Sequence, residues 1–253
     1  WQLSPRWHLN LGLRYGLETA PREVNGRTEV PYRCDCNNFS PRFGFAFQGG
    51  PWGVLRGAYT LSYSQIIPGT YQQARFNPPG IINIELTNPD LLDPLRGIDL
   101  RGLASGLRSG LFLLDSGLRD PYSHQYTLNW ERQFRQDWRV RLGYVGSRTF
   151  QLFSPLVLNR ARRVPGVDHV TATVNQRRPD QRYYEVTRVS NMNNAYLDAA
   201  QISLTLPGRR GLSFTAAYTF AKALDTGADY TSTGSGEDII YDAGQTEFDI
   251  HKD

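Results

Sequence analysis

Eight polar residues occupy alternate positions beside apolar neighbours, and they are the candidates for contact with a ligand or with another part of the protein. They are Arg14, Arg42, Arg56, Asn129, Glu131, Arg139, Arg141 and Gln201. Guanidinium, carboxylate and amide groups recognise partners through hydrogen bonds and ion pairs. None of the eight is a nucleophile with a base beside it, so the chemistry that the set supports is recognition.

The other reactive side chains form no catalytic or metal-binding set. The histidines are His8, His124, His169 and His251, and none falls in a metal-spaced motif. Ser147 and Ser235 lack the G-x-S-x-G elbow that exposes a nucleophilic serine. We therefore predict a protein that is not an enzyme and that needs no cofactor or metal ion for its function.

Three features leave more than one interpretation open. The acidic stretch 225–249 could hold calcium or be a solvated loop. Cys34 and Cys36 could form a local disulfide, bond to another part of the protein or remain free thiols. The leucines at positions 100, 103, 107, 111 and 114 have helical spacing, which fits either a short amphipathic helix or an irregular loop.

The elements that must position the eight polar residues are extended, because apolar residues recur with a period of two. The alternating segments are 7–17, 39–47, 55–63, 122–132, 138–144, 196–206 and 212–220. Most approach the roughly 9–11 residues that a tilted strand needs to cross a bilayer, whereas soluble strands average about 5–6. The pattern predicts about seven membrane-crossing strands.

The arginines determine which face of each strand points to lipid and which points to the lumen. An arginine that faces lipid at the bilayer midplane costs roughly 2–4 kcal/mol. Arg14, Arg42 and Arg56 must therefore face a lumen, and so must Arg139 and Arg141. The aromatic and leucine-rich face of each strand then points to lipid, and the two assignments agree from strand to strand.

The connections between these strands alternate between short and long. Tight turns are predicted at 4–6, 49–51, 134–137 and 207–211, and long polar loops at 18–37, 64–121, 147–194 and 223–247. Tryptophans lie near the tight turns and tyrosines near the long loops, as aromatic belts at two membrane interfaces would place them. The pattern is typical of an outer-membrane barrel with short periplasmic turns and long extracellular loops.

Composition agrees with a barrel and argues against other classes. The 253 residues are 40% hydrophobic, with no apolar run near the roughly 18 residues of a membrane helix. The formal charge of +4 comes from scattered arginines, which gives nucleic-acid binding little support. We predict an all-β protein: an antiparallel transmembrane β-barrel segment, unclosed as an isolated piece, in the cell outer membrane.

The order of several short segments resembles the barrel of Oar-like TonB-dependent receptors. The segments are Asn38–Phe45, Val54–Tyr59, Pro121–Trp130, Gly143–Arg148, Ala195–Leu204, Gly211–Asp225 and Phe248–His251. The resemblance implies a large transporter that moves a bulky substrate and carries a plug and, in most members, a carboxypeptidase-regulatory-like domain. It implies that residues 1–253 are part of a single barrel domain without the plug, TonB box and C-terminal closing strands.

The resemblance also implies partners. These are outer-membrane lipid, the protein's own plug and remaining barrel strands, the TonB complex, and a substrate that the sequence leaves unknown. The eight polar residues would contact the plug or the substrate. Two other classes compete: a passive porin-like channel, which lacks a plug, and a secreted soluble β-protein that binds carbohydrate.

Overall fold

One β-sheet dominates the computed structural model, which describes residues 1–22, 24–26, 30–66, 68–78, 80–81, 90–97, 108–134, 138–209 and 211–226. Its strands are β1 (Gln2–Ser4), β2 (Trp7–Glu18), β3 (Asp35–Gln48), β4 (Val54–Tyr63), β5 (Ser109–Leu114), β6 (Tyr122–Gln133), β7 (Arg139–Val157), β8 (Tyr183–Arg209) and β9 (Leu212–Asp225). The helices in these residues are short: η1 (Gly50–Trp52), α1 (Pro68–Gln72), η2 (Gln73–Phe76) and η5 (Thr171–Arg177). In the described part of the chain, no helix is both long and apolar enough to cross a membrane.

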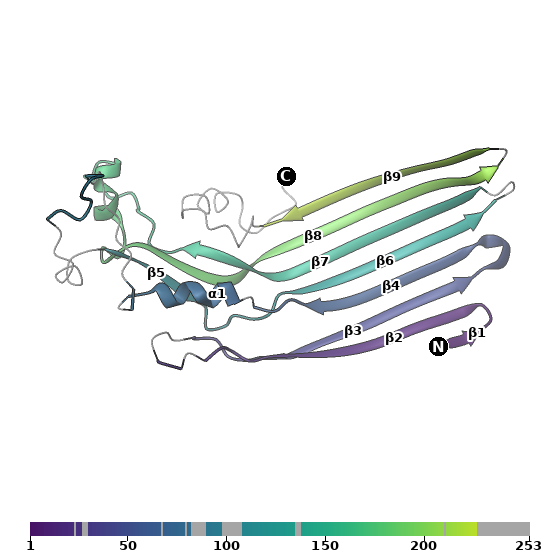
Figure 1. The fold of residues 1–253 in the computed structure, drawn as a ribbon, viewed down its shortest axis with the longest axis horizontal. Helices are drawn as coiled ribbons and strands as arrows, with labels where there is room; N and C mark the ends of the chain where they lie inside the picture. The colour runs from purple at the N-terminus through teal and green to yellow at the C-terminus, as the bar shows by residue number, and fades with distance from the viewer. Residues whose placement is uncertain are drawn as a thin grey trace.

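Each long strand pairs with the next along the chain, in antiparallel fashion, as the alternating pattern predicted. All seven predicted strands are present, as β2, β3, β4, β6, β7, β8 and β9. Figure 1 shows the short turns together at one end of the sheet and the long connections together at the other. The turn between β8 and β9 is tighter than predicted, because β8 continues past Pro207 to Arg209.

The strand β5 departs from this order. It pairs in parallel with β8, so the prediction that every pair is antiparallel is wrong here. Leu111 and Leu114 lie in this strand, so both interpretations of the leucine pattern, a short helix and an irregular loop, are wrong for them. The leucines at 100, 103 and 107 lie outside the described residues. The outer part of β8 pairs with β7 along one of its two edges. Along the other edge, β9 pairs with β8 only from Ala195 onward, so the outer part of that edge is left for another strand. β5 occupies that second edge.

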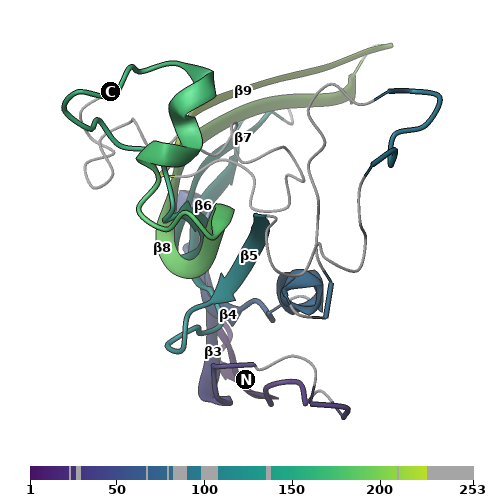
Figure 2. The same cartoon turned by 90° about the vertical axis from the view of Figure 1, so that its left-hand side faces the viewer.

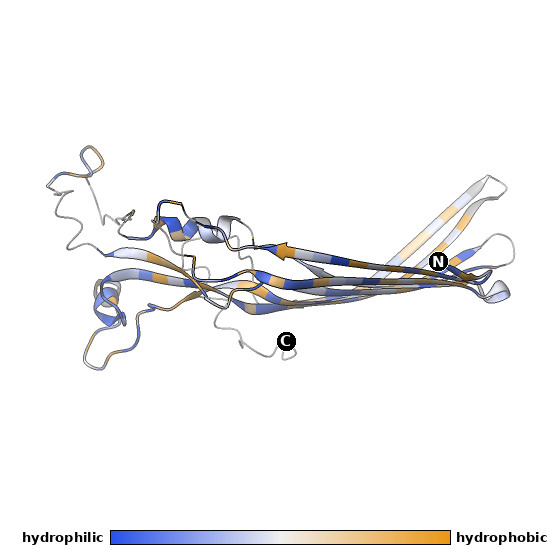
Figure 3. Ribbon diagram, turned by 90° about the horizontal axis from the view of Figure 1, so that it is seen from below, coloured by the Kyte–Doolittle hydropathy of each residue, from blue (hydrophilic) through white to orange (hydrophobic). Residues whose placement is uncertain are grey.

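The register confirms that the two faces of the sheet are sorted. Phe43 pairs with Leu11 and Tyr59, whereas Arg42 pairs with Gly12 and Thr60. Paired residues point to the same side, so the aromatic face is continuous from strand to strand and the arginine face lies opposite. Figure 3 shows the resulting alternation of hydropathy along the strands.

The sheet is an open, curved wall. Figure 2, viewed from the loop end, shows the strands from β3 to β9 as an arc with β5 and α1 on its inner side. β1 and β9 lie at the two lateral edges of the wall. The leucines on the aromatic face are exposed, including Leu11 at 52% and Leu142 at 43%, as side chains that contact lipid would be.

The strands β7 and β8 extend well past the wall, and this corrects the predicted loop at 147–194. β8 has 27 residues, so at about 3.3 Å per residue it is roughly 90 Å long, about three times the hydrocarbon thickness of a bilayer. A register shift between Thr149 and Leu152, with Gln151 at φ +60°, marks where the hairpin leaves the wall. Backbone pairing then continues outward, and the loop shrinks to 158–182.

The compact core lies at the loop end. It consists of Tyr32, Ile66, Ala74, Leu114, Leu118, Phe153 and Val189, contributed by the long connections and by the outer parts of β5, β7 and β8. Val189 is fully buried. We call this core, with the long connections and the outer parts of β5, β7 and β8 that form it, the outer platform. Burial of apolar area stabilises the outer platform. The wall leaves one apolar face exposed, so its stability depends on backbone pairing and on the surrounding lipid.

Candidate functional site

Four of the predicted polar residues form one ion-pair cluster, which we call the arginine cluster: Arg56, Glu131, Arg139 and Arg141. The Glu131 carboxylate lies 2.9 Å from Arg141 Nη2, 3.5 Å from Arg139 Nε and 3.7 Å from Arg56 Nη1. Register explains the convergence, because Glu131 pairs directly with Arg141. Arg139 lies two residues away on the same face, and Arg56 lies diagonally across on β4.

The arginine cluster has an excess of positive charge. Three guanidinium groups share one carboxylate, which leaves a formal charge of +2. The arginine side chains are 52–58% exposed, so each ion pair stabilises the fold by at most about 1 kcal/mol. Among the described residues, Glu131 is the one acceptor that these three guanidinium groups contact, and arginine prefers carboxylate and phosphate oxygens as partners. The cluster is therefore suited to binding an anionic group of a partner.

Asn129 and Gln201 extend the arginine cluster along the same face. Asn129 pairs with Arg56 on β4 and with Gly143 on β7, and Gly143 pairs in turn with Gln201 on β8. A Cβ atom on Gly143 would lie 2.7 Å from Asn129 Oδ1 and 3.5 Å from Gln201 Oε1. Both amide groups therefore lean over the glycine beside the cluster, where they can donate and accept hydrogen bonds.

Arg14 and Arg42 lie on the same face but apart from the arginine cluster. Arg14 pairs with Ser40, and Arg42 with Gly12 and Thr60, toward the loop end of β2 and β3. Neither forms a salt bridge with a described residue. The structure thus places all eight predicted residues on one face and brings six together. That this face lines a lumen stays a prediction.

A cluster of carboxyl groups around the buried Asp120 joins the long 64–121 connection to this face, and sequence reasoning missed it. Asp120 is 2% exposed, and its backbone N–H donates to Asp35 Oδ2 at 2.9 Å. Asn38 Nδ2 donates to Asp120 Oδ2 at 2.5 Å. Glu18 accepts a hydrogen bond from the Ile66 backbone N–H at 3.2 Å. Asn38 has the same parity as Arg42, so the outer connections fold over the polar face.

Burial raises the pKa values of two of these carboxyl groups, those of Glu18 and Asp120. Glu18 lies just beyond the membrane-crossing part of β2, and burial followed by the charge of Asp120 raises its pKa from 4.5 to about 7. Burial, and then the charge of Asp35, also raises the pKa of Asp120. The nearby charge of Asp120 disfavours the ionised form of Glu18, so Glu18 takes up a proton more readily than an isolated carboxyl group.

The attachment of the 64–121 connection should therefore weaken as pH rises. Because the folded pKa of Glu18 lies above its unfolded value, the stabilisation is complete below about pH 4.5 and lost as pH passes 7. The loss is smaller than the full shift implies, because Glu18 is partly exposed and solvent screens its charge. Hydrogen exchange at the Ile66 amide, corrected for intrinsic rate, should speed up from pH 5 to 8. Glu18→Gln should flatten this dependence, and Asp168→Asn should leave it intact.

An outward-facing ion pair is a second feature that sequence reasoning missed. Arg148 Nη2 contacts both carboxylate oxygens of Asp198 at 2.8 and 3.0 Å, and its guanidinium carbon lies 5.4 Å from the Tyr196 ring centroid. The Tyr144 hydroxyl also donates to Asp198. Arg148 pairs with His124 on the aromatic face, unlike the five arginines that were predicted to face a lumen. It lies among the tyrosines near the loop end, where a paired charge meets the polar interface rather than hydrocarbon.

Cys34 and Cys36 are joined to each other, which selects the local disulfide from the alternatives. The bond closes the end of the connection between β2 and β3. Tyr15 donates its hydroxyl proton to the Cys36 carbonyl at 2.7 Å, so the disulfide segment is anchored to β2. The predicted acidic loop lies almost entirely in 227–253, outside the described residues.

A curved antiparallel wall with an exposed apolar face, a polar face, short turns at one end and long loops at the other defines an outer-membrane β-barrel segment. The chain belongs to the family described as outer membrane beta barrel domain, which matches residues 29–252. It is therefore a protein of the outer membrane, and the secreted soluble alternative is wrong. None of the curated proteins matches the chain.

Three solved structures resemble the chain at low identity. The outer membrane transporter YddB from Escherichia coli is 13% identical, with a TM-score of 0.45 over 75% of this chain and 20% of its own. The FrpB iron transporter from Neisseria meningitidis is 12% identical, with a TM-score of 0.46 over 87% of this chain and 24% of its own. The siderophore receptor PirA from Pseudomonas aeruginosa is 15% identical, with a TM-score of 0.46 over 88% of this chain and 32% of its own. The chain thus spans a fifth to a third of the length of these structures.

Proposed function

We propose that this chain is part of the wall of a TonB-dependent receptor, which moves a bulky substrate across the outer membrane. The arginine cluster is the observation that carries the proposal. It places a formal charge of +2 on the polar face, close to the short turns at Gly49–Gly53 and after Gln133. A plug domain that fills the lumen would supply the missing negative charge.

The open wall supports the same proposal. Backbone groups at an unpaired strand edge cost several kcal/mol each in lipid, so β1 and β9 need further strands beside them. We propose that residues 1–253 belong to one barrel domain whose remaining strands and plug are formed by other residues. The TonB complex would act on that plug from the periplasmic side.

A passive porin-like channel is the competing proposal. In a water-filled lumen the arginine cluster would be solvated and would favour the passage of anions. The two proposals differ in one measurable property, which is the steady ion current through the protein at rest. A plugged barrel blocks this current, and an open channel carries it.

Planar-bilayer conductance of the complete outer-membrane protein tests the proposal. We expect a low steady conductance, and a leak in the triple variant Arg56→Gln, Arg139→Gln, Arg141→Gln. The docked fraction of the plug should fall about tenfold or more, because one charge-assisted hydrogen bond is worth about 1.5–3 kcal/mol. The triple variant Arg160→Gln, Arg162→Gln, Arg163→Gln removes as many charges from an outer loop and should not leak. A large anion-selective current in the unmodified protein would establish the porin-like channel instead.

A further inference from the structure

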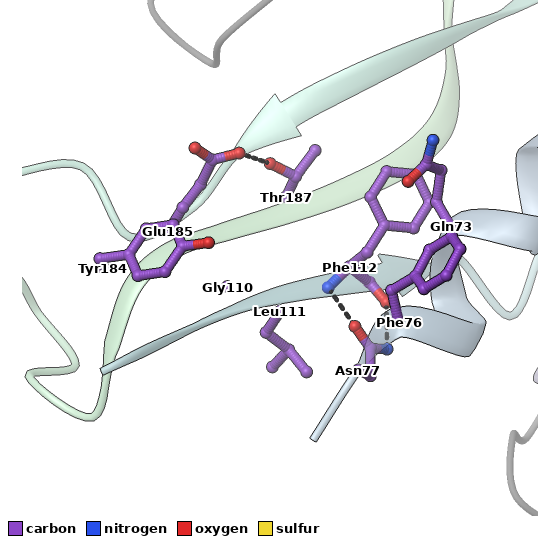
Figure 4. A pocket seen from close by; sticks show the side chains of 9 residues that line it. All are labelled: Gln73, Phe76, Asn77, Gly110, Leu111, Phe112, Tyr184, Glu185 and Thr187. Atoms are coloured by element: carbon purple, nitrogen blue, oxygen red, sulfur yellow. Dashed lines mark hydrogen bonds between the residues drawn. The ribbon is translucent and has the colours of Figure 1, made fainter. Parts of the chain in front are cut away.

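A small pocket lies in the outer platform, away from the arginine cluster. Its volume is about 160 Å³, and three elements line it: η2, β5 and the outer part of β8. Figure 4 shows the lining side chains, which are Gln73, Phe76, Asn77, Gly110, Leu111, Phe112, Tyr184, Glu185 and Thr187. At about 30 Å³ per water molecule, the pocket holds a group the size of about five waters. It therefore fits one functional group and its stem.

Aromatic rings form the sides of the pocket. Phe76 and Phe112 lie together on one side and Tyr184 lies on the other (Figure 4). The two elements that carry the phenylalanines are fixed to each other. Asn77 Nδ2 donates to the Phe112 carbonyl, and the Phe112 N–H donates to Asn77 Oδ1, both at 2.7 Å. The ring positions are thus set before any ligand arrives, which lowers the entropy cost of binding.

Gly110 keeps the space between the two sides open. A Cβ atom at this position would lie 3.0 Å from the Tyr184 hydroxyl oxygen and 3.3 Å from Tyr184 Cζ. A larger side chain would therefore enter the pocket and crowd the tyrosine. The glycine offers a way to fill the pocket without removing any group that lines it.

The charge of the pocket selects the kind of ligand. Among its described lining residues only Glu185 is charged, and its Oε1 accepts a hydrogen bond from the Thr187 hydroxyl at 2.8 Å. Ring faces carry negative potential, so they attract cations as the carboxylate does. Arg75 contacts the Phe76 ring but does not line the pocket. Anions are disfavoured here, and a cation gains from both the carboxylate and the rings.

We propose that this pocket binds an organic cation: an ammonium or guanidinium group, carried either by a small free amine or by a lysine or arginine side chain of a polypeptide. The proposal rests on the proposed function in one respect, because it takes the loop end of the wall to be the extracellular side. The pocket then meets a ligand before the lumen does. It is a recognition site on the platform, separate from the cluster on the wall.

Isothermal titration of the complete protein in detergent tests this with matched probes. Agmatine represents the free amine, and a short arginine peptide with acetylated and amidated termini represents the polypeptide. The same blocked peptide with citrulline in place of arginine is neutral and nearly isosteric. We expect binding of one or both cationic probes and none of the citrulline peptide. The arm that binds more tightly identifies the source of the cation.

Variants tie the binding to the pocket. Glu185→Gln keeps an acceptor for Thr187 but removes the charge, and should weaken binding about tenfold. Gly110→Leu should abolish binding by filling the space. Asp168→Asn removes a carboxylate elsewhere in the outer loops and should leave the affinity unchanged. Equal binding of arginine and citrulline peptides, or full affinity in both pocket variants, would overturn the proposal.

The conductance assay separates this proposal from the proposed function. Glu185→Gln and Gly110→Leu should retain the low steady conductance of the unmodified protein, which also shows that they fold. If a pocket variant loses probe binding but keeps the low conductance, the pocket has changed and the plug has not. A leak in the unmodified protein would refute the plug while leaving the titration result to stand on its own.

Discussion

Leu128→Arg is expected to lower the free energy of unfolding in lipid by about 2–4 kcal/mol, the cost of a charge on the lipid face near the bilayer midplane. Leu128 lies in the middle of β6, pairs with Gly57 and Tyr144 on the aromatic face, and is 48% exposed. No described acidic residue pairs with it to compensate the new charge. The arginine would have to extend toward an interface or distort the bilayer.

Thr127→Arg is the matched control. Thr127 precedes Leu128 in the same strand, pairs with Ala58 and Val145 on the polar face, and lies at nearly the same depth. Its substitution should change stability by roughly 0.5 kcal/mol or less. Urea titration in lipid vesicles measures both values, with the heat-dependent gel shift as a check on barrel formation. Similar losses in the two variants would show that the faces are not sorted between lipid and lumen.

Gly53→Ala is expected to have the second large effect, a loss of about 3 kcal/mol. Gly53 follows η1 with φ +93° and ψ −155°, a conformation that is essentially restricted to glycine. A Cβ atom there would lie 2.2 Å from the Glu131 backbone oxygen and 3.0 Å from Arg132 Cβ. Relief requires β4 and β6 to move apart at the residue that holds the arginine cluster.

Gly50→Ala distinguishes backbone conformation from collision. Gly50 lies in the same turn with φ +61°, and nothing lies within 4 Å of its added Cβ atom. Its cost should be about 1 kcal/mol, from the left-handed conformation alone. Gly53→Ala should also raise the leak in planar bilayers, because Glu131 is displaced, whereas Gly50→Ala should not. Equal stability losses would mean that the turn shifts freely.

The wall could be predicted from the sequence because its information is local. Alternation within each strand fixes the two faces, and arginines such as Arg56 and Arg141 exclude one face from lipid. The pairing of Glu131 with Arg141 follows once the turn between β6 and β7 is placed. The proximity of six of the eight predicted polar residues can therefore be predicted from strand order and register, without the structure of the long loops.

The outer platform could not be predicted in the same way, because its contacts join distant parts of the chain. Glu18 and Asp35 are paired across β2 and β3, but Asp120 joins them only when the long 64–121 connection folds over the polar face. The stretch around Leu111 has no strand alternation, since β5 is defined by its partner β8. The position of Arg148 could not be predicted for another reason. The rule that keeps arginines off the lipid face applies to isolated charges, and Arg148 forms an ion pair with Asp198.

The parallel pairing of β5 with β8 sets an order of assembly. Within β1 to β4, and within β6 to β9, each strand forms a hairpin with the next one along the chain, so these two parts of the wall can each grow by local steps. Leu111 in β5 pairs with Val186 in β8, and this pair cannot form until the chain that contains β6 and β7 has been placed. Contacts of such long sequence separation form slowly, because loop closure must precede them. The platform is therefore the last part to mature, and cation binding in its pocket would report that folding is complete.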